Sequence, residues 1–193
     1  MAESLSVEHE EGTGAIAMKA YDELWGVAED NYGIVTSAQA RELGVSRQNL
    51  AAMERGGLLT RLCHGVYQIK HHVPGANDVF AAGVAMAGET AYLRGASVIA
   101  MLGLAPTDPG RVFVGAGKRV RRRLPAGFAL KDRTPCDAVE FDGFEGIRCQ
   151  PLAAALRTAR DEGAIEADRI ADAAAKAREQ GLLSDEESAQ FQD

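Results

Sequence analysis

The segment from residue 36 to residue 69 constrains the fold most, because capping residues, apolar positions and turn residues follow one another there at helical and then at strand spacing. Thr36 can cap a short helix, with Gln39 returning the interaction three residues later. Gly44 can adopt the left-handed conformation that ends such a helix. The pattern therefore predicts one short helix between Thr36 and Gly44.

A second helix is predicted almost immediately after the first. Ser46 can cap its N-terminus, Leu50 and Met53 fall on one face at helical spacing, and Gly56-Gly57 can end it. Two helices joined by a turn of about three residues that contains a glycine are typical of a helix-turn-helix. We interpret Leu50 and Met53 as core residues.

The first residues of the second helix carry side chains that can read DNA. In a helix-turn-helix these positions meet base edges in the major groove, and here they are Arg47, Gln48 and Asn49. Ala51 and Ala52 are small enough to let the helix lie close to the groove. Phosphate contacts are expected from the cations nearby, which are Arg41, Arg55, Arg61 and Lys70.

Two strand patterns follow the second helix. They cover Leu59–Cys63 and Val66–Lys70 on either side of His64-Gly65, and they predict the β-hairpin that is called a wing. Its inward face is expected to carry Leu62, Tyr67 and Ile69, and its outward face Arg61, Gln68 and Lys70. A winged helix can also serve protein contact, since a fold alone does not fix function, but we favour DNA binding.

The distribution of charge also favours a contact with nucleic acid. Residues 36–70 contain five Lys or Arg and two acids, a net charge of 5 − 2 = +3, in a chain whose total is −7. Residues 71–131 are basic as well (8 − 3 = +5), whereas residues 1–35 (1 − 8 = −7) and 132–193 (7 − 15 = −8) are acidic. Phosphate affinity depends on the local patch, so the acidic flanks are expected to serve solubility.

Length and composition predict a globular protein of two small domains, with 193 residues of which 46% are hydrophobic. No apolar run approaches the roughly 20 residues that span a bilayer, and the acidic N-terminus does not resemble a signal peptide. We therefore expect a cytoplasmic protein without membrane contact. The three cysteines lack CxxC spacing, which argues against disulfides and structural zinc. Cys63, His64, His71 and His72 are interpreted as a solvated turn rather than a metal site, and no cofactor is expected.

The chain is predicted to have three parts. Residues 1–13 form a flexible leader, residues 14–72 the winged helix-turn-helix domain, and residues 73–193 a C-terminal domain. The Pro-Gly composition of residues 71–78 is that of a linker. A first helix over residues 14–30 is expected to complete the core of the first domain. Its apolar side would consist of Ile16, Tyr21, Leu24 and Val27.

The C-terminal domain is predicted to be mixed α/β with terminal helices, which makes the whole chain α+β. The expected elements are helices at 79–86, 96–102, 152–161 and 165–180, β-structure with glycine turns at 111–133, and a strand pair at 137–150. Pro151 suits the first turn of the third helix. The last helix carries only a narrow apolar stripe, which can dock on the domain core or on a partner.

No catalytic constellation stands out in the sequence. GAGK at residues 115–118 lacks the earlier glycine and the Ser or Thr that a phosphate-binding loop needs, and no third glycine completes a dinucleotide fingerprint. The patterns HExxH and GxSxG do not occur either. We therefore do not expect an enzyme.

The run KRVRRR at residues 118–123 is the second strong feature. Five cations in six residues repel one another, which favours phosphates or an acidic surface opposite them, but a solvated hairpin tip explains the run equally well. If a partner is bound there, the contact residues are Lys118, Arg119, Arg121, Arg122 and Arg123.

Three segments carry a family likeness. They are residues 33–69, AYLRGASVIAMLGL at residues 91–104 and GIRCQPLAAALRTA at residues 146–159. Together, and in this order, they resemble the AbiEi-type antitoxins of type IV toxin-antitoxin systems. The resemblance implies an N-terminal winged helix-turn-helix that represses its own operon. It also implies a C-terminal antitoxin domain that counters a cognate nucleotidyltransferase-type toxin, by direct binding or by an indirect route.

Two other functions stay open at this point. The first is a winged-helix transcriptional regulator with a ligand-sensing C-terminal domain and no toxin partner. The second is an enzyme that acts on nucleic acid through the basic strands of the C-terminal domain, for which a catalytic constellation is missing. For the antitoxin and for the ligand-sensing regulator, a dimer on an inverted repeat of operator DNA would suit the fold.

Overall fold

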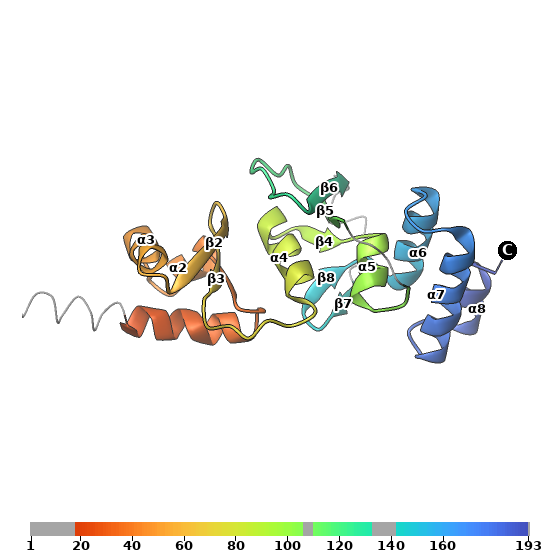
Figure 1. Ribbon diagram of the computed structural model, residues 1–193, viewed down its shortest axis with the longest axis horizontal. Helices are drawn as coiled ribbons and strands as arrows, with labels where there is room; N and C mark the ends of the chain where they lie inside the picture. Colours follow the sequence, from red (N-terminus) through yellow and green to blue (C-terminus); the bar gives the residue numbers. More distant parts are fainter. Residues whose placement is uncertain (1–17, 106–109, 133–141, 193) are drawn as a thin grey trace, which may run out of the picture. The chain divides into compact units, whose positions relative to one another are not determined.

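The computed structural model describes residues 18–105, 110–132 and 142–192. The chain divides into two compact units, one that ends at Gly75 and one that begins at Ala76 (Figure 1). Each unit is described by itself below. The predicted leader at residues 1–13 lies outside the described residues, as do Ile16 and Cys136.

The first unit contains helices packed on a small antiparallel sheet. Its elements are a helix whose described part covers residues 18–29, β1 (Ile34–Thr36), α2 (Ser37–Glu42), α3 (Arg47–Arg55), β2 (Leu59–Cys63) and β3 (Val66–Ile69). The strand order is β1-β3-β2, and both pairings are antiparallel. The α+β class is confirmed, and this unit has the helix-turn-helix and the wing that the sequence predicts.

Local capping explains why α2 begins and ends where it does. The backbone N–H of Gln39 donates to Thr36 Oγ1 at 3.2 Å, and the N–H of Thr36 donates to Gln39 Oε1 at 2.9 Å. Gly44 has a φ of +76°, and its N–H donates to the carbonyl of Arg41 at 3.0 Å. The predicted reciprocal cap and left-handed C-terminal glycine are therefore confirmed.

The core of the first unit joins the first helix, α2, α3 and the sheet. It is formed by buried apolar side chains that include Leu24, Val35, Leu50, Met53 and Ile69. Leu50 and Met53 are core residues, as predicted, and they hold α3 against β2. The opposite face of α3 is therefore left to solvent.

Three details of this core differ from the sequence expectation. Leu62 is only half-buried, and Leu59, which pairs with Ile69, is the buried leucine of β2 instead. The register of β2 against β3 shifts between Arg61 and Cys63, around Leu62. A β-bulge of this kind interrupts the regular alternation of inward and outward side chains along the strand. On the first helix Ala28 is buried, whereas Val27 is half-buried.

The second unit is built on a five-stranded mixed sheet. In chain order its elements are α4 (Asp78–Ala87), β4 (Ala91–Leu93), α5 (Ala96–Met101), β5 (Val112–Ala116), β6 (Phe128–Asp132), β7 (Asp142–Phe144), β8 (Ile147–Cys149), α6 (Leu152–Asp161), α7 (Ala167–Glu179) and α8 (Asp185–Ala189). The strand order is β6-β5-β4-β8-β7. The pairs β4/β5 and β7/β8 are antiparallel, and the pairs β5/β6 and β4/β8 are parallel.

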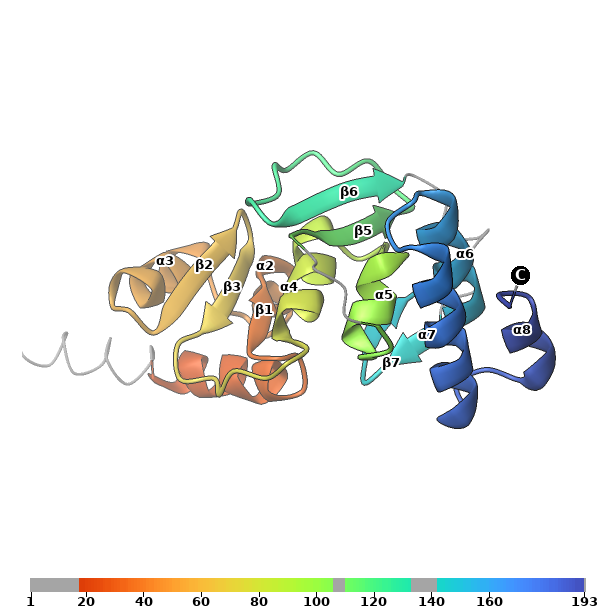
Figure 2. The same cartoon turned by 45° about the vertical axis from the view of Figure 1, so that its right-hand side comes forward.

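The parallel pairing of β5 and β6 corrects one expectation. Residues 118–123 are not the tip of a hairpin, because the chain leaves the end of β5 and must return to the start of β6. Figure 2 shows the connecting segment running back along β6. No helix or strand is assigned within this connection.

Close packing at the centre of the second unit depends on one glycine. Tyr92 on β4 is fully buried, and its ring lies over Gly115 of β5. A Cβ atom at Gly115 would come within 2.3 Å of the ring carbon Cζ. A side chain at this position would therefore force the aromatic ring out of its place.

Polar contacts fasten α6 to the turn after β4. Arg94 is 8% exposed and its Nη1 donates to Glu162 Oε1 at 2.6 Å, where α6 ends. The backbone N–H of Gly95 donates to Gln150 Oε1 at 2.9 Å, and Gln150 Nε2 donates to Thr158 Oγ1 at 3.4 Å. The second and third segments of the family likeness thus meet in the structure.

The C-terminal helices cover one end of this unit. The apolar stripe of α7 is buried, and α7 contacts α6 and α8, so the stripe faces other parts of the same unit. The helices after residue 150 begin and end close to the predicted positions. The strand β4 and the helix α8 were not predicted.

Candidate nucleic-acid interface

The N-terminal turn of α3 presents polar side chains on the exposed face of the first unit. Arg47 and Gln48 are exposed and Asn49 is half-buried. Ser46 Oγ accepts the backbone N–H of Asn49 at 3.1 Å, which fixes the start of the helix. Of the residues predicted to read bases, Arg47 and Gln48 are therefore exposed on the first turn of α3, and Asn49 is half-buried.

Two further cations lie on the helices of the helix-turn-helix. Arg41 lies in the last turn of α2 and Arg55 in the last turn of α3, and both are exposed. Arg55 Nε donates to the carbonyl of Ala51 at 3.2 Å, so its guanidinium lies back along the helix. Ala51 and Ala52 are exposed and small, which leaves the face of α3 between the two ends low enough to approach DNA closely.

The wing is held by contacts that the sequence did not reveal. Arg61 Nε donates to the carbonyl of Cys63 at 3.3 Å, and Arg61 Nη2 lies 3.0 Å from His64 Nδ1. The N–H of Ser37 donates to the carbonyl of Gly65 at 2.9 Å, which ties the wing turn to the start of α2. Gly65 has a φ of +76°, a conformation that glycine adopts without steric cost. The wing tip is thus rigid and carries a cation.

Lys70 completes the set of predicted phosphate contacts. It directly follows β3, it is exposed, and its backbone N–H donates to the carbonyl of Leu58 at 3.0 Å. Within the described part of the chain, five cations of this unit form no ion pair, namely Arg41, Arg47, Arg55, Arg61 and Lys70. Their charge is therefore available to an anionic partner.

The arrangement of helices, wing and exposed side chains in the first unit defines a class of protein. A helix-turn-helix whose second helix exposes hydrogen-bonding side chains at its N-terminus, followed by a basic wing, is a winged helix-turn-helix unit of the DNA-binding kind. The family follows from the sequence of the same unit.

Residues 27–70 match the family model described as transcriptional regulator, AbiEi antitoxin. This segment is therefore a domain of the AbiEi antitoxin family of transcriptional regulators, and the family predicted from the sequence is confirmed for it. The family is one of regulators and antitoxins rather than of enzymes. Comparison of the chain with curated proteins gives no match.

The second cationic site lies in the second unit. Lys118, Arg119, Arg121, Arg122 and Arg123 are all exposed, and Val120 between them is half-buried. They lie in the connection between β5 and β6.

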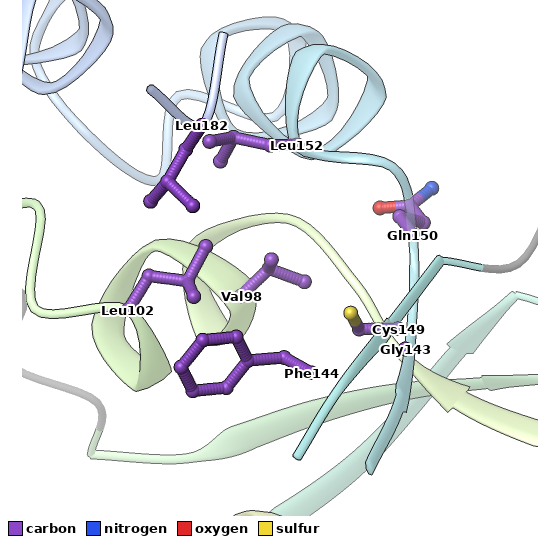
Figure 3. Close-up of a pocket in the computed structure, with 8 residues that line it drawn as sticks. All are labelled: Val98, Leu102, Gly143, Phe144, Cys149, Gln150, Leu152 and Leu182. Atoms are coloured by element: carbon purple, nitrogen blue, oxygen red, sulfur yellow. The ribbon is translucent and has the colours of Figure 1, made fainter. Parts of the chain in front are cut away.

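A pocket of about 190 Å³ opens in the second unit, and Figure 3 shows the side chains around it. Apolar side chains make up most of its wall, namely Val98, Leu102, Phe144, Leu152 and Leu182. Gln150 and the thiol of Cys149 add polar atoms at one side. The side-chain amide of Gln150 accepts from Gly95 and donates to Thr158, so its oxygen and its nitrogen already have partners within the unit.

Two further observations bear on partners. Within the described ranges, no group of three or more His, Cys, Asp and Glu residues is placed to hold a metal ion. None of the helices in those ranges combines the length and the apolar character that crossing a membrane requires.

Proposed function

We propose that this chain is the antitoxin of a bacterial type IV toxin-antitoxin system, which represses its own operon through the first unit and neutralises a cognate nucleotidyltransferase-type toxin through the second. The observation that carries the proposal is the uncovered, cationic N-terminal turn of α3 within a segment that matches the AbiEi family. The family description names both regulation and antitoxin activity.

In repression, different residues of the first unit contact the bases and the phosphates. Arg47, Gln48 and Asn49 read base edges in the major groove, because they occupy the exposed first turn of α3. The positioning contacts to phosphate come from the cations around them, which are Arg41, Arg55, Arg61 and Lys70. With these four phosphate contacts at about −0.9 each, log affinity falls with log salt at a slope near −3.6.

Neutralisation is assigned to the second unit because the two remaining segments of the family likeness form one packed centre there. The contacts from Arg94 to Glu162 and from Gly95 to Gln150 join residues that are 68 and 55 positions apart. Two copies of the chain on an inverted repeat suit the winged-helix unit.

The test is co-expression of the chain with the product of the neighbouring gene, scored by growth and by a promoter reporter. We expect the full chain to restore growth and to repress the reporter. Arg47→Ala is expected to relieve repression and to leave growth rescue intact, whereas Arg169→Ala on α7 serves as the charge-matched control for both readouts. Absence of toxicity from the neighbour, or no rescue by the full chain, would refute the antitoxin assignment.

The pocket of the second unit supports a second candidate function, a transcriptional regulator that senses a small ligand. The pocket has mostly apolar walls with polar atoms from Gln150 and Cys149 at one side, and its volume of about 190 Å³ suits only a small ligand. In that case a small apolar compound with one hydrogen-bonding group raises the melting temperature of the full chain, and Leu182→Trp abolishes the effect. A neighbouring gene of metabolism rather than a toxin would favour this candidate.

A further inference from the structure

The turn of the wing holds an arginine and a histidine in direct contact. Arg61 Nη2 lies 3.0 Å from His64 Nδ1, and Arg61 Nε donates to the carbonyl of Cys63 at 3.3 Å. Both Arg61 and His64 are exposed. A guanidinium has donors and no acceptor, so His64 Nδ1 is the acceptor in this contact. The contact is therefore that of a neutral imidazole that carries its proton on Nε2.

Protonation of this imidazole is incompatible with the contact. It places a donor on His64 Nδ1, opposite the donating Nη2 of Arg61, and a second positive charge beside the guanidinium. Histidine is the side chain that ordinarily changes charge between pH 5 and 8. The wing turn can thus exist in two forms, one with a single cation held by a neutral imidazole and one with two adjacent cations that need an anion.

The elements around the turn supply few groups that can answer this second charge. Besides Arg61, β2 adds the thiol of Cys63, and β3 adds the phenol of Tyr67, which is buried. The helix α2, whose first residue is bonded to the turn, carries Arg41 and Glu42 at its far end. No Asp or Glu occurs between residues 55 and 77. The wing therefore has no carboxylate of its own for an imidazolium, and the anion must come from a partner.

A DNA phosphate fits this requirement. Its oxygens accept from a guanidinium and from an imidazolium, so one phosphate group can replace the contact between Arg61 and His64 by two charge-assisted hydrogen bonds. The wing belongs to the segment that matches a family of transcriptional regulators, and exposed cations on the same unit make DNA the expected anion there. Binding of DNA then favours the protonated form of His64.

We propose that His64 is a proton-dependent phosphate contact, which takes up a proton when the first unit binds DNA and then holds the backbone together with Arg61. This inference rests on the proposed function, because it assumes that the winged helix binds DNA. It adds to that function a dependence of DNA affinity on pH, carried by one side chain of the wing turn.

The affinity for DNA should rise as the pH falls. The complex holds one proton more than the free protein, so acid favours the complex, and the gain is lost as the pH rises through the range in which the bound imidazole titrates. One proton limits the effect to tenfold per pH unit. If the bound imidazole titrates one pH unit above the free one, the affinities at the acid and alkaline limits differ by about tenfold.

The test measures the binding of full-length variants to a promoter duplex and to a scrambled duplex between about pH 5.5 and 7.5. Thiols and phenols are ordinarily neutral in this range and carboxylates are charged, so imidazoles account for most of the titration. His64→Gln keeps an acceptor for Arg61 but does not titrate, and His64→Lys carries a permanent charge. His71→Gln is the matched control, because His71 is exposed and belongs to the same unit. The melting temperature at each pH establishes that every variant is folded.

The four proteins are expected to differ most at low pH. The unmodified chain and His71→Gln bind both duplexes more tightly as the pH falls, and their salt dependence steepens by about 0.9, the value of one added phosphate contact. His64→Gln matches the unmodified chain at about pH 7.5 and falls behind it progressively below that pH. His64→Lys binds at about pH 7.5 as tightly as the unmodified chain binds at about pH 5.5.

Two outcomes would overturn the inference. One is a His64→Gln protein that keeps the pH dependence and the salt dependence of the unmodified chain. The other is a loss of affinity in His64→Gln by the same factor at every pH, which would give His64 a role that does not involve its charge. A promoter-to-scrambled ratio near one in the unmodified chain would instead refute the proposed reading role of α3, and a pH effect that depends on His64 on both duplexes would still support this inference.

Discussion

Replacing Arg47 by alanine gives the sharpest prediction about DNA recognition. Arg47 is the first residue of α3, it is exposed, and it forms no ion pair in the described part of the chain, so its removal leaves the fold intact. A bidentate contact between arginine and a base is worth about 1–3 kcal/mol of discrimination. Since each 1.4 kcal/mol is tenfold, the affinity for the promoter should fall by about 5- to 150-fold.

The loss should be specific to the promoter sequence. On scrambled DNA the variant loses at most the sequence-independent attraction of one charge, which is much smaller at moderate salt. Arg55→Ala is the matched control, because it removes the same charge from the last turn of the same helix. We expect that control to weaken binding to both duplexes alike.

The assay is fluorescence anisotropy on promoter and scrambled duplexes at one fixed salt concentration, with a footprint on the promoter. A changed melting temperature of the Arg47→Ala protein would show that the residue has a structural role. An equal loss on both duplexes, or an unchanged footprint and affinity, would refute the assignment of Arg47 to base reading.

Three further predictions concern stability. Tyr21→Phe should raise the melting temperature slightly, because the Tyr21 hydroxyl is buried without a hydrogen-bond partner in the described chain and this burial raises its pKa. Gly115→Ala should cost about 1–3 kcal/mol in denaturant unfolding, because the new methyl would overlap the Tyr92 ring, and an unchanged midpoint would show that the ring can move. Bonds from the backbone and hydroxyl of Ser184 lower the pKa of Glu187, so this carboxylate stabilises α8 above its ordinary pKa and that stabilisation is lost as the pH falls through the lowered value. Ser184→Ala should therefore flatten the acid side of the stability profile, and parallel profiles would contradict this.

Much of the first unit was predictable because its signals are local. The caps at Thr36 and Ser46 and the glycines after each helix act through hydrogen bonds within three or four residues. These capping signals can be recognised in the sequence without the tertiary structure. The same holds for the exposed start of α3, because Leu50 and Met53 fix which face is buried.

Other features of that unit were not predictable, since distant partners decide them. The strand β1 has only three residues and is stabilised by its pairing with β3. The register of β2 against β3 shifts around Leu62, which is half-buried, whereas Leu59 pairs with Ile69 and is buried. His64 was interpreted as part of a solvated turn, and nothing in the sequence indicates that it contacts Arg61.

In the second unit some features could be predicted from the sequence and others could not. Its glycines, helices and basic run were visible, and so was the likeness of two segments to the antitoxins. Strand direction was not visible in the sequence, because a parallel and an antiparallel neighbour require the same apolar residues. Only the assembled sheet shows that β5 and β6 run in parallel.

The sequence by itself determined the helix-turn-helix, its capping and the cationic character of the surfaces, because these depend on neighbours along the chain. The tertiary structure decided that Arg94 meets Glu162, that Gln150 holds Gly95 beside a pocket, and that residues 118–123 belong to a connection between parallel strands rather than to a hairpin tip. These contacts join residues far apart in the chain, and their energy becomes available only when the sheet and helices have packed.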